Sequence, residues 1–231
     1  MSEPSLSPLE GTALVEIEGL LAAAHGARPP LRPWKRLVDV AVAAISSFFA
    51  LPAVLVAAFL VAVVDRHFPF YTDVRVGMGG RPFRCFKIRT MDADPRILED
   101  YLAEHLAERE IYRKTRKLSF DPRITRVGAF LRKSSIDEFP QLWNVLHGDM
   151  SLVGPRPLAP AEFLERGALG LPLTLVRPGL TGLWQTRGRS DLTIRRRIAL
   201  DNFYAKHCSP ALDIGVLLRT PLAVLRGKGA R

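Results

Sequence analysis

The feature that most limits how this chain can fold is an uncharged run of 25 residues, from Val40 to Val64. A helix that spans a membrane needs about 20 apolar residues, so this run is long enough to enter a bilayer. Pro52 lies near its middle, and an internal proline removes one backbone donor and bends or breaks a helix. Each half would then measure about 18 Å, which is shorter than a hydrocarbon core of about 30 Å.

Basic residues stand on both sides of this run, namely Arg32, Lys35, Arg36, Arg66 and Arg75. Lys and Arg that flank a membrane segment tend to stay on the cytoplasmic side, and here both ends carry them. The pattern favours a re-entrant helix hairpin, residues 34–66, that enters the membrane and returns to the cytoplasmic face. A straight spanning helix is the alternative, because neighbouring groups can compensate for a proline. A buried core helix or a cleaved signal peptide fits the run less well.

The rest of the chain divides around this element. Residues 1–33 are rich in small residues and proline, which predicts a tail or a loosely docked helix. Residues 67–231 are enough for a cytoplasmic catalytic domain with its own core. Two cysteines give neither a disulfide framework nor zinc spacing, which is typical of a reducing compartment. The net charge of +10 suits anionic lipid, phosphate ligands or nucleic acid without distinguishing them.

Residue spacing predicts an α+β fold that is mostly helical. The segment 75–89 alternates around Gly77, Gly79 and Gly80, which predicts a hairpin that leads into a strand at 83–88. Proline and glycine predict rigid turns at 154–157 and 177–182. Apolar spacing predicts helices at 94–117, 124–132, 134–147, 194–204 and 212–225.

The adjacent carboxylates Asp137 and Glu138 are the candidate catalytic groups of this chain. Ser134 or Ser135 is expected to cap the helix that follows, which would place both carboxylates in its first turn. Adjacent helical side chains diverge by about 100°, so we expect one carboxylate to attack or transfer a proton and the other to hold a hard metal ion. The simpler explanation is two acids that stabilise a helix N-terminus.

Rigidly framed basic residues favour a phosphate site over this simpler explanation. Planar guanidinium groups match phosphate oxygens bidentately, and a proline-framed arginine loses less entropy when it binds. Several such groups beside a carboxylate pair predict a nucleotide or diphosphate site. The chain has no Walker-type glycine loop and no Rossmann fingerprint. The basic residues concerned are Lys87, Arg89, Arg123, Arg126 and Arg156.

Taken together, these segments resemble the monotopic bacterial phosphoglycosyl transferases, the sugar transferases that start glycan assembly on undecaprenyl phosphate. The resemblance begins near Trp34, continues to the end of the chain, and implies interfacial amphipathic helices beside a re-entrant helix at the cytoplasmic face of the bacterial plasma membrane. Five segments carry it in the family's order: 87–91 (Lys-Ile-Arg-Thr-Met), 121–128 (Asp-Pro-Arg-Ile-Thr-Arg-Val-Gly), 131–146, 148–157 and 177–185.

The resemblance implies a specific reaction. Asp137 would attack the sugar-bearing phosphorus of a UDP-sugar, UMP would leave, and undecaprenyl phosphate would then accept the phosphosugar. Glu138 is matched to the residue linked to Mg²⁺, and Arg156 to phosphate binding. Membrane lipid is an implied partner, nucleic acid is not, and a homo-oligomer is compatible with the resemblance. The expected substrate-binding set is Lys87, Arg89, Arg123, Arg126, Arg156, Arg177, Gly179, Gln185 and Asp201.

Two features depart from or refine this resemblance. Leu51 precedes Pro52 where the family often has serine, so the geometry of the helix break is less defined. The segment 113–120 is similar to that of members that use UDP-galactose, which favours galactose. Two other functions stay open: a membrane-anchored basic scaffold that binds acidic lipid or nucleic acid, and a metal-dependent phosphohydrolase.

Overall fold

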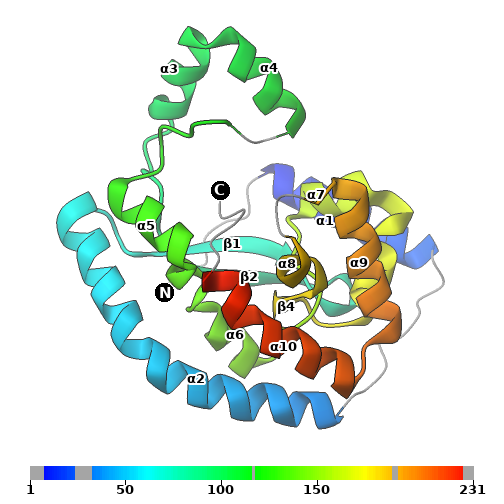
Figure 1. The fold of residues 1–231 in the computed structure, drawn as a ribbon. Helices are drawn as coiled ribbons and strands as arrows, with labels where there is room; N and C mark the ends of the chain where they lie inside the picture. Colours follow the sequence, from blue (N-terminus) through cyan, green and yellow to red (C-terminus); the bar gives the residue numbers. More distant parts are fainter. Residues whose placement is uncertain (1–7, 24–32, 116–117, 189–191, 226–231) are drawn as a thin grey trace.

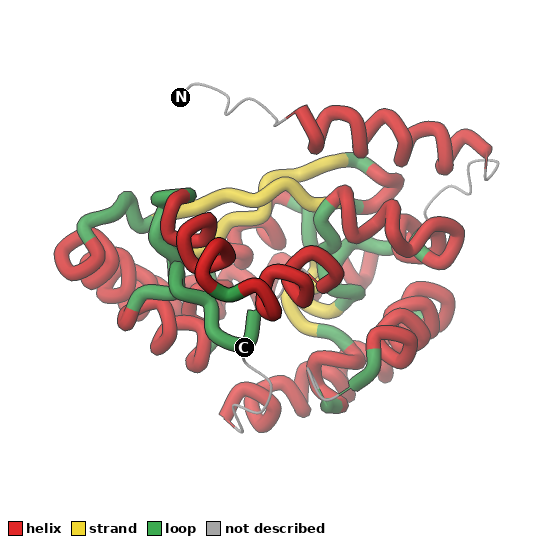
Figure 2. Tube along the Cα trace, turned by 90° about the horizontal axis from the view of Figure 1, so that it is seen from above, coloured by secondary structure: helices red, strands yellow, loops and turns green. Residues whose placement is uncertain are grey.

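The computed structural model describes residues 8–23, 33–115, 118–188 and 192–225, and these form helices packed around two small sheets (Figures 1 and 2). This arrangement confirms the α+β, mostly helical fold that the sequence predicts. The largest core cluster joins α2 (Pro33–Leu60), α6 (Gln141–His147), β3 (Ser151–Val153), α9 (Ile194–His207) and α10 (Pro210–Leu225).

The uncharged run forms one continuous helix, α2, which passes through Pro52 and ends in a π-helical turn, Val61–Asp65. Figure 1 shows that α2 bends as it wraps around the domain, and Pro52 lies inside this helix without ending it. In its most apolar window only 11% of the residues are buried, which rules out the core-helix alternative. By length and composition, Pro33–Asp65 is the one helix in the described part of the chain that could cross a membrane.

Small residues on α2 contact the domain, while large apolar ones face outward. Ala43 and Ala57 are buried in two core clusters, whereas Phe48, Phe49 and Phe59 are exposed. A soluble helix normally buries its largest apolar residues, because their burial contributes most to stability. The reversed pattern on α2 is that of a helix whose outer face meets an apolar medium.

The first turns of α2 are anchored in the domain by polar side chains. Lys35 Nζ lies 2.6 Å from Asp213 Oδ2, and Arg36 donates to the Leu146 carbonyl at 2.7 Å. Asp39 Oδ1 accepts the Leu152 N–H at 3.0 Å. Because these contacts are built into the folded core, the segment is an integral part of the protein and not a cleavable signal peptide.

Part of the predicted tail is a docked helix, α1 (Pro8–Ala23). Ile17 is fully buried against Leu158 and Phe163, and Leu21 packs in the same cluster. Figure 2 shows α1 beside the end of the β-hairpin. Residues 1–7 and 24–32 lie outside the described part of the chain.

The predicted hairpin is confirmed and begins earlier than expected. Strands β1 (Phe70–Val76) and β2 (Pro82–Ile88) are antiparallel, with Tyr71 opposite Lys87. At the turn, Gly79 and Gly80 have φ of 70° and 75°, a conformation that glycine adopts without strain. Beyond β2, the predicted helix at 94–117 is divided at His105 into α3 (Arg96–Glu104) and α4 (Leu106–Thr115), which project from the body (Figure 1); residues 116–117 are not described.

The helix predicted at 134–147, with its serine cap, is wrong at its start. Ser134 is the last residue of α5 (Arg126–Ser134), and its hydroxyl donates to the Phe130 carbonyl at 3.0 Å. Ser135 adopts a left-handed conformation, φ 59°, and caps no helix with its side chain. A separate helix, α6, begins only at Gln141 and ends at Gly148, as expected from that glycine.

The C-terminal half places two short parallel strands beside the helices. β3 and β4 (Gly179–Thr181) pair with Ser151 opposite Gly179, so the predicted turn at 177–182 contains a strand. The basic helix predicted at 194–204 is confirmed as α9, which Thr193 caps through the Arg196 N–H. The final helix is confirmed as α10, and between these elements lie α7 (Pro160–Arg166) and α8 (Leu183–Arg187).

Candidate functional site

Asp137 and Glu138 lie in a single 3-10 turn, Ile136–Glu138, which connects α5 to α6 and packs against β2. Helix α5 is fixed at its start by Thr125, whose hydroxyl accepts the Gly128 N–H at 2.8 Å. It ends at the left-handed Ser135, which turns the chain back toward the hairpin. The two carboxylates therefore occupy a constrained turn between packed elements, not an exposed helix end.

The environment of Asp137 changes its acidity. Burial, and then the neighbouring Glu138 carboxylate, raises the pKa of Asp137 to about 6, while Lys87 and Arg132 act in the opposite direction. The group is therefore mostly ionised at neutral pH and yet less stabilised as an anion than a surface carboxylate. Asp137 itself is not among the residues that line the adjoining cleft, whereas its neighbour Glu138 is. A partly buried carboxyl group with such a pKa shift beside a cleft is a candidate catalytic group. Arg132, which also donates to Thr90 Oγ1 at 2.9 Å, was not predicted from the sequence.

Arg156 faces Glu138 across the site. Its Nη1 lies 3.8 Å from Glu138 Oε1, and the side chains are 38% and 27% exposed. Arg156 follows β3 in the sequence Gly154-Pro155-Arg156-Pro157, where the flanking prolines restrict the backbone. The guanidinium is thus held beside the carboxylate pair and remains reachable by a ligand.

A polar cleft surrounds these groups. The cations that line it repel one another: burial lowers the pKa of Lys87, and the Arg156 and Arg75 charges lower it further. A ligand that carries several negative charges would relieve this repulsion. Of the predicted residues, Lys87, Glu138, Arg156, Gly179 and Gln185 line the cleft; the others that line it are Arg75, Gln141, Pro157 and Leu180.

Two polar atoms of this cleft lack a partner. Among the side chains that the structure describes, Arg75 Nε and Gln185 Oε1 are buried nitrogen and oxygen atoms without a hydrogen bond. A buried polar atom without a partner is costly, and native sites keep such atoms where a ligand supplies the missing bond. Arg75 Nε can donate to an anionic oxygen, and Gln185 Oε1 can accept from a hydroxyl or an N–H group.

Glycines bring β3 and β4 into close contact behind Arg156. A Cβ on Gly179 would lie 2.0 Å from the Gly154 nitrogen, and one on Gly154 would lie 2.5 Å from the Arg177 oxygen. These positions therefore exclude any side chain. Arg177 itself donates to the Gly148 carbonyl at 2.7 Å, so it fastens the end of α6 to β4 and is not part of the cleft lining.

The sequence profile of the bacterial sugar transferases matches residues 31–227, which includes every element from α2 to α10. The chain belongs to the bacterial sugar transferase family. The match begins after α1, so the docked N-terminal helix is an addition to the part that defines the family.

Similar proteins of this family are found in several bacteria. The chain is 41% identical to the UDP-galactose-lipid carrier transferase of Erwinia amylovora over 98% of this chain and 49% of that protein. It is 39% identical to the exopolysaccharide production protein ExoY of Sinorhizobium fredii over 85% of this chain and 87% of that protein. It is also 39% identical to the UDP-glucose:undecaprenyl-phosphate glucose-1-phosphate transferase of Caulobacter vibrioides, over 83% of this chain and 69% of that protein. The chain thus spans about half the length of the Erwinia relative.

In this member of the family, Asp201 lies behind the cleft and not in its lining. The residue is 1% exposed, and Arg166 Nη1 lies 3.3 Å from Asp201 Oδ2. Burial raises the pKa of Asp201 to about 6, while the Arg166 charge and the backbone N–H of Arg156 act in the opposite direction. Asp201 therefore contacts the backbone of a cleft residue and has no surface for substrate.

Three other predicted substrate ligands also lie outside the cleft lining. Arg89 donates to the Phe68 carbonyl at 3.0 Å and lies over the Tyr71 ring. Arg123 is paired with Asp121 through two bonds of 2.9 and 2.7 Å. Arg126 is exposed at the first turn of α5. Sequence spacing alone does not separate such structural arginines from ligand-binding ones.

The donor chemistry of the cleft suits a hard cation. Magnesium is commonly held by one or two carboxylates together with substrate phosphates and water, and Asp137 and Glu138 supply such oxygens. In the described part of the chain no group of three His, Cys, Asp or Glu side chains forms a ready-made cage. The carboxylate oxygens present would fit a magnesium ion only if substrate phosphates and water supplied most of its ligands.

Proposed function

We propose that this chain transfers a sugar 1-phosphate from a UDP-sugar to undecaprenyl phosphate through a covalent aspartyl-phosphosugar intermediate, the first membrane step of glycan assembly. The names of the relatives support both ends of this reaction. The Erwinia protein is named for UDP-galactose and a lipid carrier, and the Caulobacter protein for UDP-glucose and undecaprenyl phosphate. Galactose is the sugar that we propose first.

The observation that carries the proposal is a half-buried carboxylate, Asp137, beside a cation cluster. Asp137 has a raised pKa, and Arg156 and Lys87 lie in the adjoining cleft. Carboxylates are established covalent nucleophiles for phosphoryl groups. Cations beside the phosphoryl oxygens stabilise the charge that develops in the transition state.

The two half-reactions balance at one phosphorus atom. An Asp137 oxygen forms a bond to the sugar-bearing phosphorus, the bond from that phosphorus to the bridging oxygen breaks, and UMP leaves with the electron pair. A phosphate oxygen of undecaprenyl phosphate then attacks the same phosphorus and releases the Asp137 carboxylate. Arg156 and Lys87 orient the diphosphate, and Glu138 would hold magnesium, which neutralises phosphate charge when bound.

We place the reaction at the cytoplasmic face of the bacterial plasma membrane. The outward apolar face of α2 supports membrane insertion, and the polar contacts of Lys35 and Asp39 tie the start of α2 to the domain. The bend of α2 is compatible with a re-entrant helix that returns to the same face. The amphipathic helices of the catalytic domain would then lie at the membrane–water interface.

Topology is tested by single cysteines on either side of α2. In a chain with Cys85 and Cys208 replaced, His25→Cys and Phe70→Cys should both react with an impermeant maleimide added from the cytoplasmic side of inverted vesicles. Reaction of the two cysteines from opposite sides would replace the re-entrant helix with a spanning one.

The reaction is tested by UMP release from a panel of UDP-sugars with magnesium and undecaprenyl phosphate. We expect release of UMP, a labelled phosphosugar on the protein when lipid is omitted, and loss of that label in Asp137→Asn. Without lipid, UMP should appear as a burst equal to the enzyme concentration. Continued turnover into free sugar phosphate would indicate the phosphohydrolase, and salt-sensitive lipid binding with no UMP release would indicate the scaffold.

A further inference from the structure

Helix α9 lies against the turn that carries Arg156 at two points, one at Arg156 itself and one at Val153, just before the turn. Asp201 and Tyr204 are three residues apart, on one face of the helix, and both are 1% exposed. The backbone N–H of Arg156 lowers the pKa of the Asp201 carboxyl group, so the two groups lie near each other. The Tyr204 hydroxyl lies 2.8 Å from the carbonyl oxygen of Val153, the last residue of β3.

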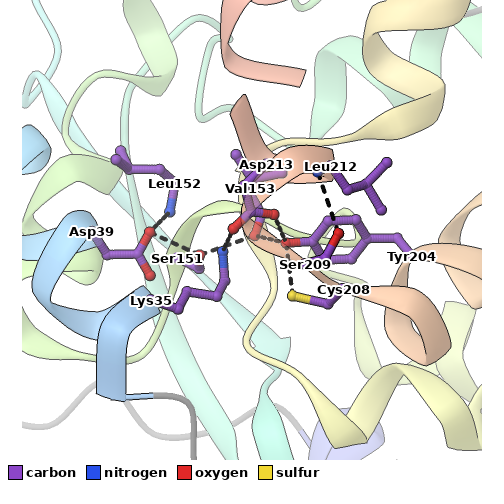
Figure 3. Close-up of polar contacts among 10 residues, drawn as sticks. All are labelled: Lys35, Asp39, Ser151, Leu152, Val153, Tyr204, Cys208, Ser209, Leu212 and Asp213. Atoms are coloured by element: carbon purple, nitrogen blue, oxygen red, sulfur yellow. Dashed lines mark hydrogen bonds and ion pairs between the residues drawn. The ribbon is translucent and has the colours of Figure 1, made fainter. Parts of the chain in front are cut away.

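The Tyr204 hydroxyl is itself held by a buried network, drawn in Figure 3. It lies 2.6 Å from Asp213 Oδ1, and Asp213 Oδ2 lies 2.6 Å from Lys35 Nζ of α2. The Cys208 thiol donates to the hydroxyl oxygen at 3.5 Å. The position of the hydroxyl therefore depends on three elements, α2, α9 and α10.

The hydroxyl keeps its hydrogen under all ordinary conditions. Burial, and then the Asp213 carboxylate, raises the pKa of Tyr204 above that of an ordinary tyrosine. The single hydrogen is shared between Val153 and Asp213. Ser151 Oγ also reaches the Val153 carbonyl, at 2.9 Å, but it lies 3.0 Å from Asp39 Oδ1 and has only one hydrogen to donate. Tyr204 is thus one of two shared donors at this carbonyl.

We propose that Tyr204 is a positioning residue for Arg156: its hydroxyl fixes the end of β3, and the proline-framed turn transmits that position to the guanidinium. The two prolines restrict the backbone of the turn, and the Gly154 N–H is bonded to the Thr181 carbonyl at 2.9 Å. A shift of Val153 therefore moves Arg156 with it. This inference rests on the proposed function only in assigning Arg156 to the diphosphate.

The test uses Tyr204→Phe in the full-length chain, with inorganic pyrophosphate as the probe for Arg156 and thermal unfolding as the readout. The phenylalanine ring should pack as the tyrosine ring does, but it cannot donate a hydrogen bond to the Val153 carbonyl. We expect pyrophosphate affinity to fall about fivefold, the effect of one neutral hydrogen bond. With a UDP-sugar, KM should rise by a similar factor, while the rate of UMP release at saturating donor should change by less than about twofold.

A double-mutant cycle distinguishes positioning from a general loss of stability. In an Arg156→Ala background, Tyr204→Phe should leave the remaining pyrophosphate affinity unchanged, because the residue that it positions is gone. Thr220→Val is the matched control. It removes another partly buried hydroxyl, which pairs with Thr181 Oγ1 at 2.9 Å, and should leave pyrophosphate affinity as in the wild type.

A second variant probes the same network from α2. Lys35→Gln removes the cation beside Asp213, so the unpaired carboxylate draws the Tyr204 hydrogen away from Val153, and pyrophosphate affinity should again fall. Equal losses for Tyr204→Phe with and without Arg156, or unchanged affinity in both variants, would overturn the inference. If the wild type binds pyrophosphate through Arg156 but releases no UMP, the proposed function fails and the positioning role is still measured.

Discussion

The Arg156 guanidinium lies 3.8 Å from the Glu138 carboxylate, although one residue follows β3 and the other precedes α6. Both side chains are partly exposed, so this ion pair contributes little to folding. It holds a cation and a carboxylate side by side in the same cleft, where the guanidinium can bind phosphate oxygens. The relationship therefore concerns ligand binding more than stability.

Asp137→Asn should abolish formation of the phosphosugar adduct. The amide is isosteric with the carboxyl group but is not a nucleophile, and loss of a covalent nucleophile commonly lowers the rate by about 10³-fold or more. The measurement is radiolabel retained on the protein after incubation with a UDP-sugar. Glu110→Gln, which alters an exposed carboxylate of α4, is the control; adduct formation at the wild-type rate in Asp137→Asn would exclude Asp137 as the nucleophile.

The rate of adduct formation should rise with pH through about 6, because attack requires the ionised form of Asp137 and its pKa is raised to about that value. Single-turnover UMP release between pH 5 and 8 measures this rate. A profile that is already flat from pH 5 would contradict an Asp137 nucleophile with this pKa.

The contribution of Asp137 to the stability of the folded protein should change with pH in the opposite sense, so that it falls as pH rises. The pKa of Asp137 is raised in the folded state from 3.8 to about 6, so the folded protein holds this proton more tightly than the unfolded chain. The resulting stability is fully present below about pH 4 and is lost as pH rises through 6. Asp137→Asn should therefore gain stability relative to the wild type between pH 4 and 7, measured by urea unfolding; a gain that shrinks over this range would contradict the raised pKa.

Arg156→Lys should weaken the binding of pyrophosphate although it keeps the charge. Lysine lacks the planar fork that contacts two phosphate oxygens together, and we expect a loss of about tenfold. Titration calorimetry measures the affinity. Arg109→Lys, at an exposed position of α4, should bind as the wild type does, and an equal loss in both variants would point to net charge alone.

Gly179→Ala should destabilise the protein by about 2 kcal/mol or more, because its Cβ would lie 2.0 Å from the Gly154 nitrogen and force β3 and β4 apart. Gly215→Ala is the matched comparison, since nothing lies within 4 Å of that Cβ in α10. There alanine should stabilise the helix by about 0.5–1 kcal/mol. Urea unfolding measures both changes, and similar values for the two variants would contradict the close approach of the strands.

The spacing of residues in the sequence is sufficient to predict helices and turns where the signal is local. The hairpin around Gly79, the stop of α6 at Gly148 and the basic helix α9 follow from turn residues and apolar periodicity, and each is confirmed. Local spacing failed at Ser134 and Ser135, where a serine pair before two acids matched a helix start. Packing of α5 and β2 around the turn favours a left-handed residue there instead.

The cleft lining could be predicted only in part. The sequence presents Arg75 only as a charge flanking the apolar run, because its place in the cleft depends on the register of β1 against β2, which sequence does not specify. The resemblance predicts Asp201 as a substrate ligand, yet its carboxylate is buried and lies near the backbone of Arg156. Residue type alone cannot decide either case, because arginine and aspartate occur both in structural ion pairs and as ligand-binding residues.

The sequence by itself determined the length and apolar character of α2, the family and the carboxylate pair, because length without charge and ordered motifs are properties of the chain alone. Tertiary structure decided which cations surround that pair, which arginines are occupied by structural partners, and that α2 continues through Pro52. These depend on distances between segments far apart in the chain, which are fixed only when the strands, helices and buried polar groups pack together.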